Sequence, residues 1–132
     1  MLKDNLHKVQ TQIAEALSRR TETKLTGDKV TLVAVTKNHP VDVVLESLAL
    51  GVTNIGENRV QELVQKAGED AYRGAPVHFI GHLQTNKVKQ VVGKAALIHS
   101  VDSQRLLQAI DSQAGKLGLV EDILLEVNIA GE

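Results

Sequence analysis

Apolar residues recur along the first twenty positions at the spacing of a helix. They follow one another at intervals of four, three, four and four residues, as Leu2, Leu6, Val9, Ile13 and Leu17. This spacing places them on one helix face, opposite lysine, aspartate, glutamine and arginine side chains. The pattern predicts an amphipathic helix over residues 1–20, followed by the polar loop TETKLTGDK at residues 21–29.

Beyond this loop, short apolar runs alternate with longer segments of helical character. The apolar runs predict five strands, at residues 32–36, 53–58, 76–83, 96–102 and 121–132. The segments between them predict helices at residues 40–50, 59–68, 84–93 and 103–118. Alternation through short connections is typical of parallel βαβ units with right-handed crossovers. The sequence therefore predicts one α/β domain with a parallel sheet, either an open doubly wound sheet or a (β/α) barrel.

Composition narrows the class of protein further. The chain has 132 residues, a formal net charge of −1, no cysteine, and 42% hydrophobic but only 2% aromatic residues. A core of Leu, Val, Ile and Ala suits a parallel sheet covered by helices. Nearly balanced charge gives no electrostatic reason to expect nucleic acid or an anionic membrane as partner. No apolar run has the length of a membrane span, and we expect a cytoplasmic protein.

Polar and ionisable residues recur where each predicted strand ends. In strand order they are Lys37 and Asn38, Glu57 and Asn58, His82 and Gln84, His99, Ser100 and Asp102, and Asn128. In either architecture the carboxyl ends of parallel strands lie at one edge of the sheet, where functional groups gather. We therefore expect these side chains to contribute to one site.

Lys37 is the candidate with the clearest chemistry. It follows the apolar run Leu32–Thr36, which predicts a buried strand near the centre of the sheet. Burial disfavours a charged ammonium and leaves a nucleophilic amine, which condenses with aldehydes to a Schiff base. The carbonyl partner would be pyridoxal 5'-phosphate (PLP), or a sugar or keto-acid substrate of a lysine-dependent aldolase. The alternative is a lysine that extends its ammonium into solvent.

The histidines and the segment after the third strand have weaker functional interpretations. His39, His82 and His99 lie on three different loops without a metal-binding spacing, so we expect no metal site. Asn86 and Lys87 fall in the first turn of a predicted helix. A phosphate or carboxylate could bind there, and a solvated turn fits equally well.

Four further residues at or beside the strand ends have structural interpretations. Asn58 taken alone would cap the helix that follows it. Asp102 and Ser103 precede another predicted helix and are interpreted in the same way. Glu57 fits either a charge at a helix terminus or a hydrogen-bonding residue of the site.

The strand-end motifs also carry a family resemblance. VAVTKNHP, IGENRVQE, HFIGHLQTNK, HSVDS and LLEVNIAGE resemble, in order and spacing, the motifs of the pyridoxal phosphate homeostasis proteins, which are related to the N-terminal barrel of alanine racemase. The resemblance implies an α/β fold: a (β/α) TIM-type barrel of PLP fold type III, with residues 1–132 as one PLP-binding domain. The chain would supply an N-terminal helix and roughly the first five β/α units. A complete barrel needs about 200 residues or more, so we expect truncation at the C-terminus.

The resemblance also implies a cofactor and its site. By motif position, Lys37 would hold PLP as a Schiff base, and Asn58 would lie beside the cofactor. Val35, His82 and Asn128 would contribute to the walls of the site. Members of this family are regarded as PLP-binding proteins of vitamin B6 homeostasis without established catalytic turnover.

A PLP-dependent amino-acid racemase is the alternative function. Racemisation needs an acid–base group on each face of the substrate α-carbon, and Lys37 supplies at most one. The only tyrosine, Tyr72, lies in the polar stretch GEDAYRGAP. A lysine-dependent aldolase would carry its lysine on a later strand and would lack these motifs.

Apart from the small-molecule cofactor, self-association is expected, because the outer strands of a partial barrel would be open edges.

Overall fold

The computed structural model describes residues 1–21 and 29–131, so most of the predicted loop at residues 21–29 lies outside the described residues. The elements are α1 (Leu2–Arg19), β1 (Ala34–Val35), α2 (Val41–Ala49), β2 (Ile55–Glu57), α3 (Val60–Gly68), β3 (Val77–Phe79), the 3₁₀ helix η1 (Thr85–Lys87), α4 (Val88–Val91), β4 (Leu97–Val101), α5 (Gln104–Leu117) and β5 (Asp122–Leu125). Each predicted helix and strand has a counterpart, although the strands are shorter. The helix predicted at 84–93 consists of η1 and α4.

The five strands form one parallel sheet in the order β1-β2-β3-β4-β5. A doubly wound sheet reverses its strand order at a switch point, whereas a (β/α) barrel adds each strand beside the one before it. The observed order is that of a barrel. The prediction of an α/β fold with five parallel strands is therefore confirmed.

Strand β1 differs from the prediction in length, position and burial. Only Ala34–Val35 pair as a strand, and within the described residues β1 pairs with β2 alone. The prediction that this strand lies near the centre of the sheet is therefore wrong. A strand with one neighbour is shielded on one side only, which leaves the Val35 side chain 44% exposed.

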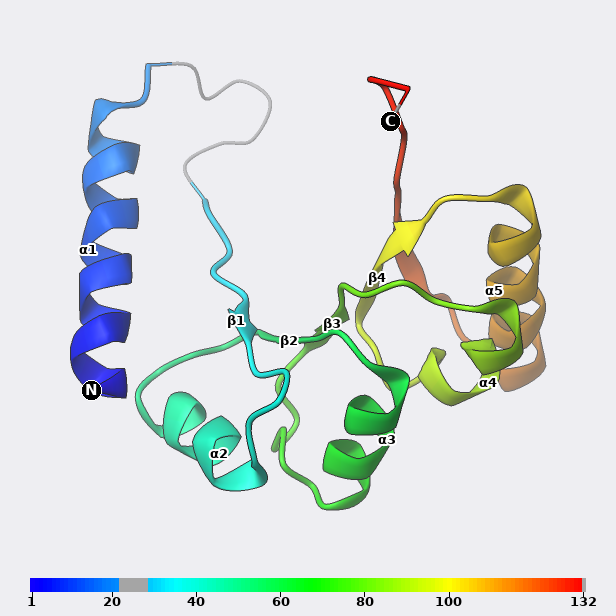
Figure 1. The fold of residues 1–132 in the computed structure, drawn as a ribbon, viewed down its shortest axis with the longest axis horizontal. Coiled ribbons are helices and arrows are strands. Elements are labelled where there is room, and N and C mark those ends of the chain that lie inside the picture. Colours follow the sequence, from blue (N-terminus) through cyan, green and yellow to red (C-terminus); the bar gives the residue numbers. More distant parts are fainter. Residues whose placement is uncertain (22–28, 132) are drawn as a thin grey trace.

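The helices lie on one side of the strand layer. Helices α2, α3, α4 and α5 form an arc outside the curved strands, and α1 stands apart beside β1 (Figure 1). Between the strands and the arc lies an apolar core, in which Ile55, Phe79 and Ile98 of the strands meet Leu63 of α3 and Leu106 of α5. Burying each such side chain contributes about 1.5–3 kcal/mol. This burial accounts for the alternating apolar pattern along the chain.

Helix α1 is the least buried of the helices. It has no fully buried residue, and its apolar stripe remains partly exposed, with Val9 40% exposed. Gln10 and Ile13 line a cavity of about 300 Å³ together with residues 30–32 and 51–54. The helix thus flanks the amino-terminal ends of β1 and β2. Among the described helices, none combines the length and apolarity that a bilayer crossing requires.

Helix α5 has defined ends. The Leu106 N–H donates to Ser103 Oγ at 3.1 Å, which makes Ser103 the N-cap. Gly118 ends the helix in the left-handed conformation, with φ of 68°, which suits glycine. The predicted cap is therefore confirmed at Ser103, whereas Asp102 precedes the cap.

Replacing the capping hydroxyl should destabilise the protein. Ser103→Ala leaves the Leu106 N–H without its side-chain acceptor, and we expect a loss of about 1 kcal/mol in the free energy of unfolding. Ser112→Ala is the matched control, because Ser112 is exposed within the same helix and alanine favours helices. Urea denaturation of both variants measures the effect. Equal stability of Ser103→Ala and wild type would show that the cap contributes nothing.

Candidate functional site

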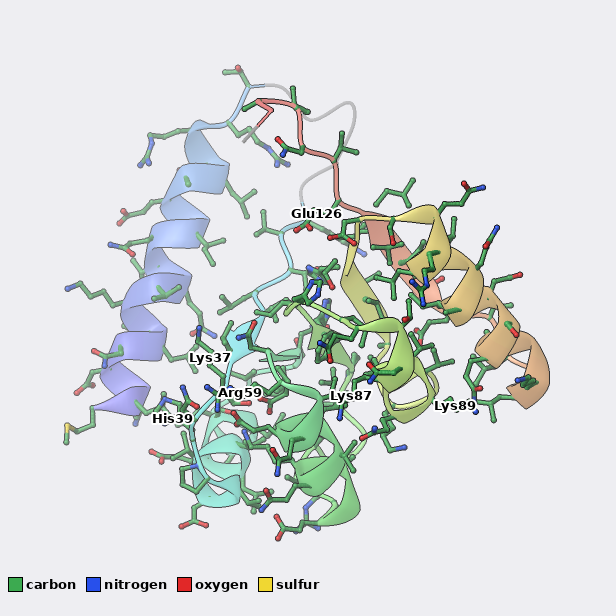
Figure 2. All side chains as sticks on the ribbon, turned by 45° about the vertical axis from the view of Figure 1, so that its right-hand side comes forward. Lys37, His39, Arg59, Lys87, Lys89 and Glu126 are labelled. Atoms are coloured by element: carbon green, nitrogen blue, oxygen red, sulfur yellow. The ribbon has the colours of Figure 1, made fainter. Side chains whose placement is uncertain are left out.

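Lys37 lies beyond the carboxyl end of β1, as predicted, with Thr36 between it and the last paired residue, Val35. Its side chain is exposed rather than buried, and no hydrogen bond or ion pair joins it to another described residue. The expectation of a buried lysine is therefore wrong, because the edge strand leaves this end of the sheet open. Figure 2 shows Lys37 next to His39, well separated from Lys89. The lysine is thus an accessible primary amine at the edge where the strand ends gather.

Asn58 and Gly81 bring the ends of β2 and β3 into close contact. A Cβ atom built on Gly81 would lie 2.0 Å from the backbone oxygen of Asn58 and 2.7 Å from its Oδ1. Only glycine permits this approach. Ser100 of β4 also donates its hydroxyl to the Gly81 carbonyl at 2.6 Å. The N-cap of α3 is Arg59 rather than Asn58, so the capping interpretation of Asn58 is wrong.

Asn58 and His82 line the same cavity, which has a volume of about 770 Å³. Two cationic residues, Arg59 and Lys87, also line it, with the amides of Gln61, Gln65, Gln84 and Gln90. The structure thus brings two of the predicted cofactor-binding residues together. Lys87 lines this cavity from η1, so the predicted first helical turn with Asn86 and Lys87 is a 3₁₀ turn rather than the start of a regular α-helix.

The remaining predicted residues lie elsewhere. Lys37 is not among the residues that line this cavity. Asn128 lines a second cavity, of about 490 Å³, with Asp102, Glu126 and Val127. Val35 is on the exposed edge strand. The described residues therefore place the predicted side chains along one edge of the sheet but not around one enclosed cavity.

No group of three or more histidine, cysteine, aspartate or glutamate side chains within the described residues is arranged to hold a metal ion. His39 and His82 are exposed, whereas His99 contacts His78. His78 Nδ1 lies 2.9 Å from His99 Nε2, and His78 Nε2 lies 2.9 Å from Asn54 Oδ1. Burial, with a smaller contribution from His99, holds the pKa of His78 below its ordinary value. The pair thus forms a hydrogen-bonded chain across β3 and β4.

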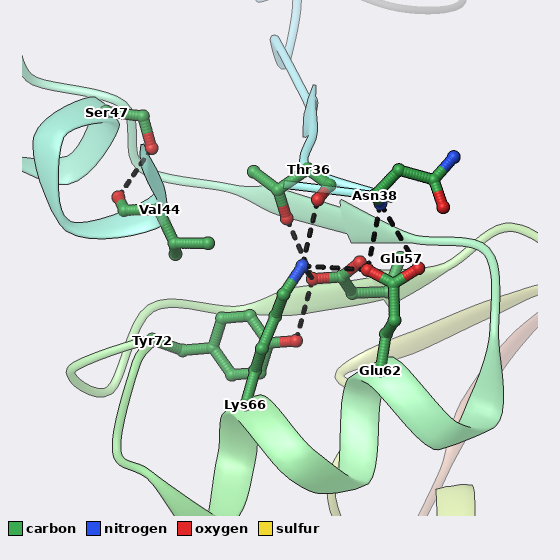
Figure 3. Close-up of polar contacts among 8 residues, drawn as sticks. All are labelled: Thr36, Asn38, Val44, Ser47, Glu57, Glu62, Lys66 and Tyr72. Carbon is green, nitrogen blue, oxygen red and sulfur yellow. Dashed lines mark hydrogen bonds and ion pairs between the residues drawn. The ribbon is translucent and has the colours of Figure 1, made fainter. Parts of the chain in front are cut away.

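A buried polar cluster, formed by Thr36, Glu57, Lys66 and Tyr72, lies behind the Lys37 turn (Figure 3). Glu57 is 0% exposed, and its Oε2 accepts from Lys66 Nζ at 3.0 Å, from Thr36 Oγ1 at 2.7 Å and from Tyr72 OH at 2.8 Å. Burial, together with the hydrogen bond to Glu57 and its charge, raises the pKa of Tyr72 far above its ordinary value. The Tyr72 hydroxyl therefore stays protonated and remains a hydrogen-bond donor. Glu57 acts through hydrogen bonds inside the fold and not as a solvated helix-terminal charge.

Glu62 connects this cluster to the backbone beside Lys37. Its Oε2 lies 3.0 Å from Lys66 Nζ, and its two carboxylate oxygens accept from the Asn38 N–H at 3.1 and 2.9 Å. Burial alone would raise the pKa of Glu62. The hydrogen bonds from Lys66 and Asn38, with the charges of Lys66 and Arg59, more than offset this, so the pKa lies below its ordinary value. Glu62 is therefore held as a carboxylate at neutral pH.

No local pattern in the sequence indicates the roles of Lys66, Glu62 and Tyr72. Lys66 and Glu62 belong to the helical segment RVQELVQKAG, where charged residues ordinarily face solvent. Their backbone partners are distant in sequence: Thr36 lies 30 residues from Lys66, and Asn38 lies 24 residues from Glu62. The signal that could have found them is Glu57 at the end of an apolar strand, because a buried carboxylate requires a cation nearby.

Comparisons with known proteins agree with this architecture. No family model matches the chain. The chain is 44% identical to the pyridoxal phosphate homeostasis protein of Aquifex aeolicus (strain VF5), over 76% of this chain and 44% of that protein. It is 33% identical to the human protein of the same name, over 96% of this chain and 49% of that protein.

Two solved structures share the fold. PipY of Synechococcus elongatus PCC7942, solved with PLP bound, has a TM-score of 0.75 at 35% identity, over 92% of this chain and 55% of PipY. A structure described as an unknown protein from Bifidobacterium adolescentis has a TM-score of 0.81 at 35% identity, over 98% of this chain and 56% of that protein.

The sequential parallel sheet and the likeness to PipY define this protein as a (β/α)-barrel protein of the PipY type, represented by its first five strands. The chain spans about half the length of the curated relatives that it matches. Over the length that it shares with them, it belongs to the pyridoxal phosphate homeostasis protein family.

The contact between Asn58 and Gly81 generates a prediction about stability. Gly81→Ala places a methyl group against the Asn58 backbone, and we expect a loss of about 1–3 kcal/mol or more in the free energy of unfolding. Gly115→Ala is the control, because no atom lies within 4 Å of the added methyl group and alanine stabilises helix interiors by about 0.5–1 kcal/mol. Urea denaturation compares the two. Similar stabilities for the two variants would contradict the close approach.

Proposed function

We propose that this protein binds PLP in the cytoplasm, as part of vitamin B6 homeostasis, and holds the cofactor as a Schiff base on Lys37. The observation that carries the proposal is the position of Lys37, an accessible amine at the carboxyl edge of a barrel-type sheet. PipY, of the same fold and 35% identical, was solved with PLP bound. Residues 1–132 would act as a single PLP-binding domain, related to the N-terminal domain of alanine racemase and corresponding to the N-terminal part of a longer barrel.

The residues present fit such a cofactor. PLP supplies an aldehyde that condenses with a primary amine, and the Lys37 amine has no competing ion pair among the described residues. In its neutral form this amine would form a C–N bond to the aldehyde carbon as one water molecule leaves. Asn58 would lie beside the ring and orient it through its amide. Val35, His82 and Asn128 would border the site and limit the access of water.

We propose further that the protein catalyses no turnover. A racemase would need a second acid–base group facing Lys37 across the substrate. Tyr72, the only tyrosine, is buried and donates its hydroxyl to Glu57 at 2.8 Å. The Tyr72 hydroxyl is therefore engaged in a buried hydrogen bond. The naming of the relatives as homeostasis proteins agrees with a binding role.

The open edges of the sheet support a further part of the proposal, self-association. In the described residues, β1 and β5 each pair with one strand only. Around β5 the chain exposes large apolar side chains, namely Leu124, Leu125, Val127 and Ile129. Unpaired strand edges with apolar side chains favour pairing with another chain. We propose that, when residues 1–132 stand alone, a second copy of the chain occupies this edge.

The Schiff base is tested by replacing the lysine. Lys37→Ala should abolish the visible absorption band that forms with PLP and the borohydride-reduced adduct found by peptide mass spectrometry. The free energy of unfolding should change by no more than about 0.5 kcal/mol, since the side chain is exposed. Lys94→Ala, which removes another exposed lysine, should leave the adduct intact. An adduct that persists on Lys87 or Lys89 in Lys37→Ala would contradict the assignment of Lys37.

The association is tested by placing a charge on the β5 edge. Leu125 is 67% exposed on β5, and Leu125→Lys should weaken self-association roughly tenfold, because an ammonium is costly to bury between paired edges. Leu117→Lys is the control, since Leu117 is 51% exposed on α5. Sedimentation velocity at several concentrations measures both. A wild-type protein that remains monomeric at high concentration would rule out the proposed edge pairing.

A further inference from the structure

The backbone turn that presents Lys37 has a defined geometry. The His39 N–H donates to the Thr36 carbonyl at 3.1 Å, so that Lys37 and Asn38 occupy the two central positions of a β-turn. Asn38 adopts a φ of 63°, in the left-handed region. Asparagine tolerates this conformation better than most residues. The conformation nevertheless needs support from its surroundings to persist.

That support comes from one face of helix α3. Lys66 Nζ donates to the carbonyl of Thr36 at 2.8 Å, and the carboxylate of Glu62 accepts from the Asn38 N–H at 2.9 and 3.1 Å. The residues immediately before and after Lys37 are therefore both held by α3. Glu62 and Lys66 are four residues apart and are themselves joined at 3.0 Å (Figure 3). We call this pair of side chains, Glu62 and Lys66, the clamp.

The clamp is anchored in the core of the protein. Lys66 is only 4% exposed, and its ammonium also binds Glu57 Oε2 at 3.0 Å. Glu57 in turn receives the hydroxyl hydrogens of Thr36 and Tyr72. Removing one partner of such a buried ion pair leaves a charge uncompensated, which is strongly unfavourable. Through Lys66 the clamp is consequently tied to the buried cluster, while the Glu62 side chain remains 19% exposed.

We propose that Glu62 and Lys66 are positioning residues that fix the Lys37 turn, so that the lysine amine meets the PLP aldehyde from one direction. This inference rests on the proposed function. With the backbone fixed, only the side-chain torsions of Lys37 must be restricted when the C–N bond forms and water leaves. Holding reacting groups in place lowers the entropic part of the barrier. An exposed lysine can therefore react selectively without being buried.

The test compares the rate of Schiff-base formation in three variants. Glu62→Ala removes both acceptors of the Asn38 N–H, whereas Glu62→Gln keeps one amide oxygen and similar packing. Glu46→Ala is the control, because Glu46 is exposed on α2 and no hydrogen bond or ion pair joins its side chain to the described residues. The first-order rate at saturating PLP is followed in the visible band, and mass spectrometry after borohydride reduction confirms Lys37 as the modified residue.

We expect Glu62→Ala to lower this rate on the order of ten- to a hundredfold. Glu62→Gln should give an intermediate rate, and Glu46→Ala should match wild type. Reductive methylation of Lys37 with formaldehyde should be unchanged in all variants, because a small free aldehyde needs no positioning. Hydrogen exchange of the Asn38 amide should be faster in Glu62→Ala. If Glu62→Ala does not fold, Glu62→Gln supplies the same comparison.

The outcomes separate the inference from the proposed function. An adduct on Lys37 that forms equally fast in wild type, Glu62→Gln and Glu62→Ala overturns the clamp and leaves the function standing. Equal slowing of Schiff-base formation and of formaldehyde methylation also overturns it, since positioning would then not be the cause. A wild-type protein that forms no adduct on Lys37 overturns the proposed function, and the clamp as a positioning device with it.

Discussion

The ion pair that the buried ammonium of Lys66 makes with Glu57 is the interaction on which this half-barrel depends. The ammonium compensates the carboxylate of Glu57, which is fully enclosed at the end of β2. Without it, that carboxylate would be an uncompensated buried charge, at a cost of about 3–5 kcal/mol. The same ammonium binds the backbone of Thr36, beyond β1. Two strands and α3 are thereby tied together at one point, which lies directly behind the candidate site.

The architecture was predictable from the sequence because its signals are local. The spacing of apolar residues within each segment indicates a strand or a helix, and the short connections between segments require parallel crossovers. The position of Lys37 beyond a strand and the cap at Ser103 followed from the same local signals, and the structure agrees with both. The family motifs added the cofactor and the type of barrel, for which the residues alone had left two architectures open.

The burial of particular side chains was not predictable in the same way, because burial depends on partners that are far away in sequence. Lys37 was expected inside the fold, yet it is exposed, since β1 has a neighbour on one side only. Lys66 belongs to a helical segment whose charged residues ordinarily face solvent, yet it is buried, since Glu57 and Thr36 converge on it from other elements. The same local pattern, a charged residue beside apolar ones, is thus exposed at Lys37 and buried at Lys66.

The sequential strand order has a consequence for how the chain folds. Each strand pairs with the strand made immediately before it, so every new strand finds its docking edge already assembled as synthesis proceeds from the N-terminus. Each of these pairings joins residues that are 19 to 25 positions apart in sequence, so the chain segment that each step must close stays of similar length. The protein can therefore grow by one strand and one helix at a time on the ribosome, with the Lys66 ion pair completed as soon as α3 has joined the first two strands.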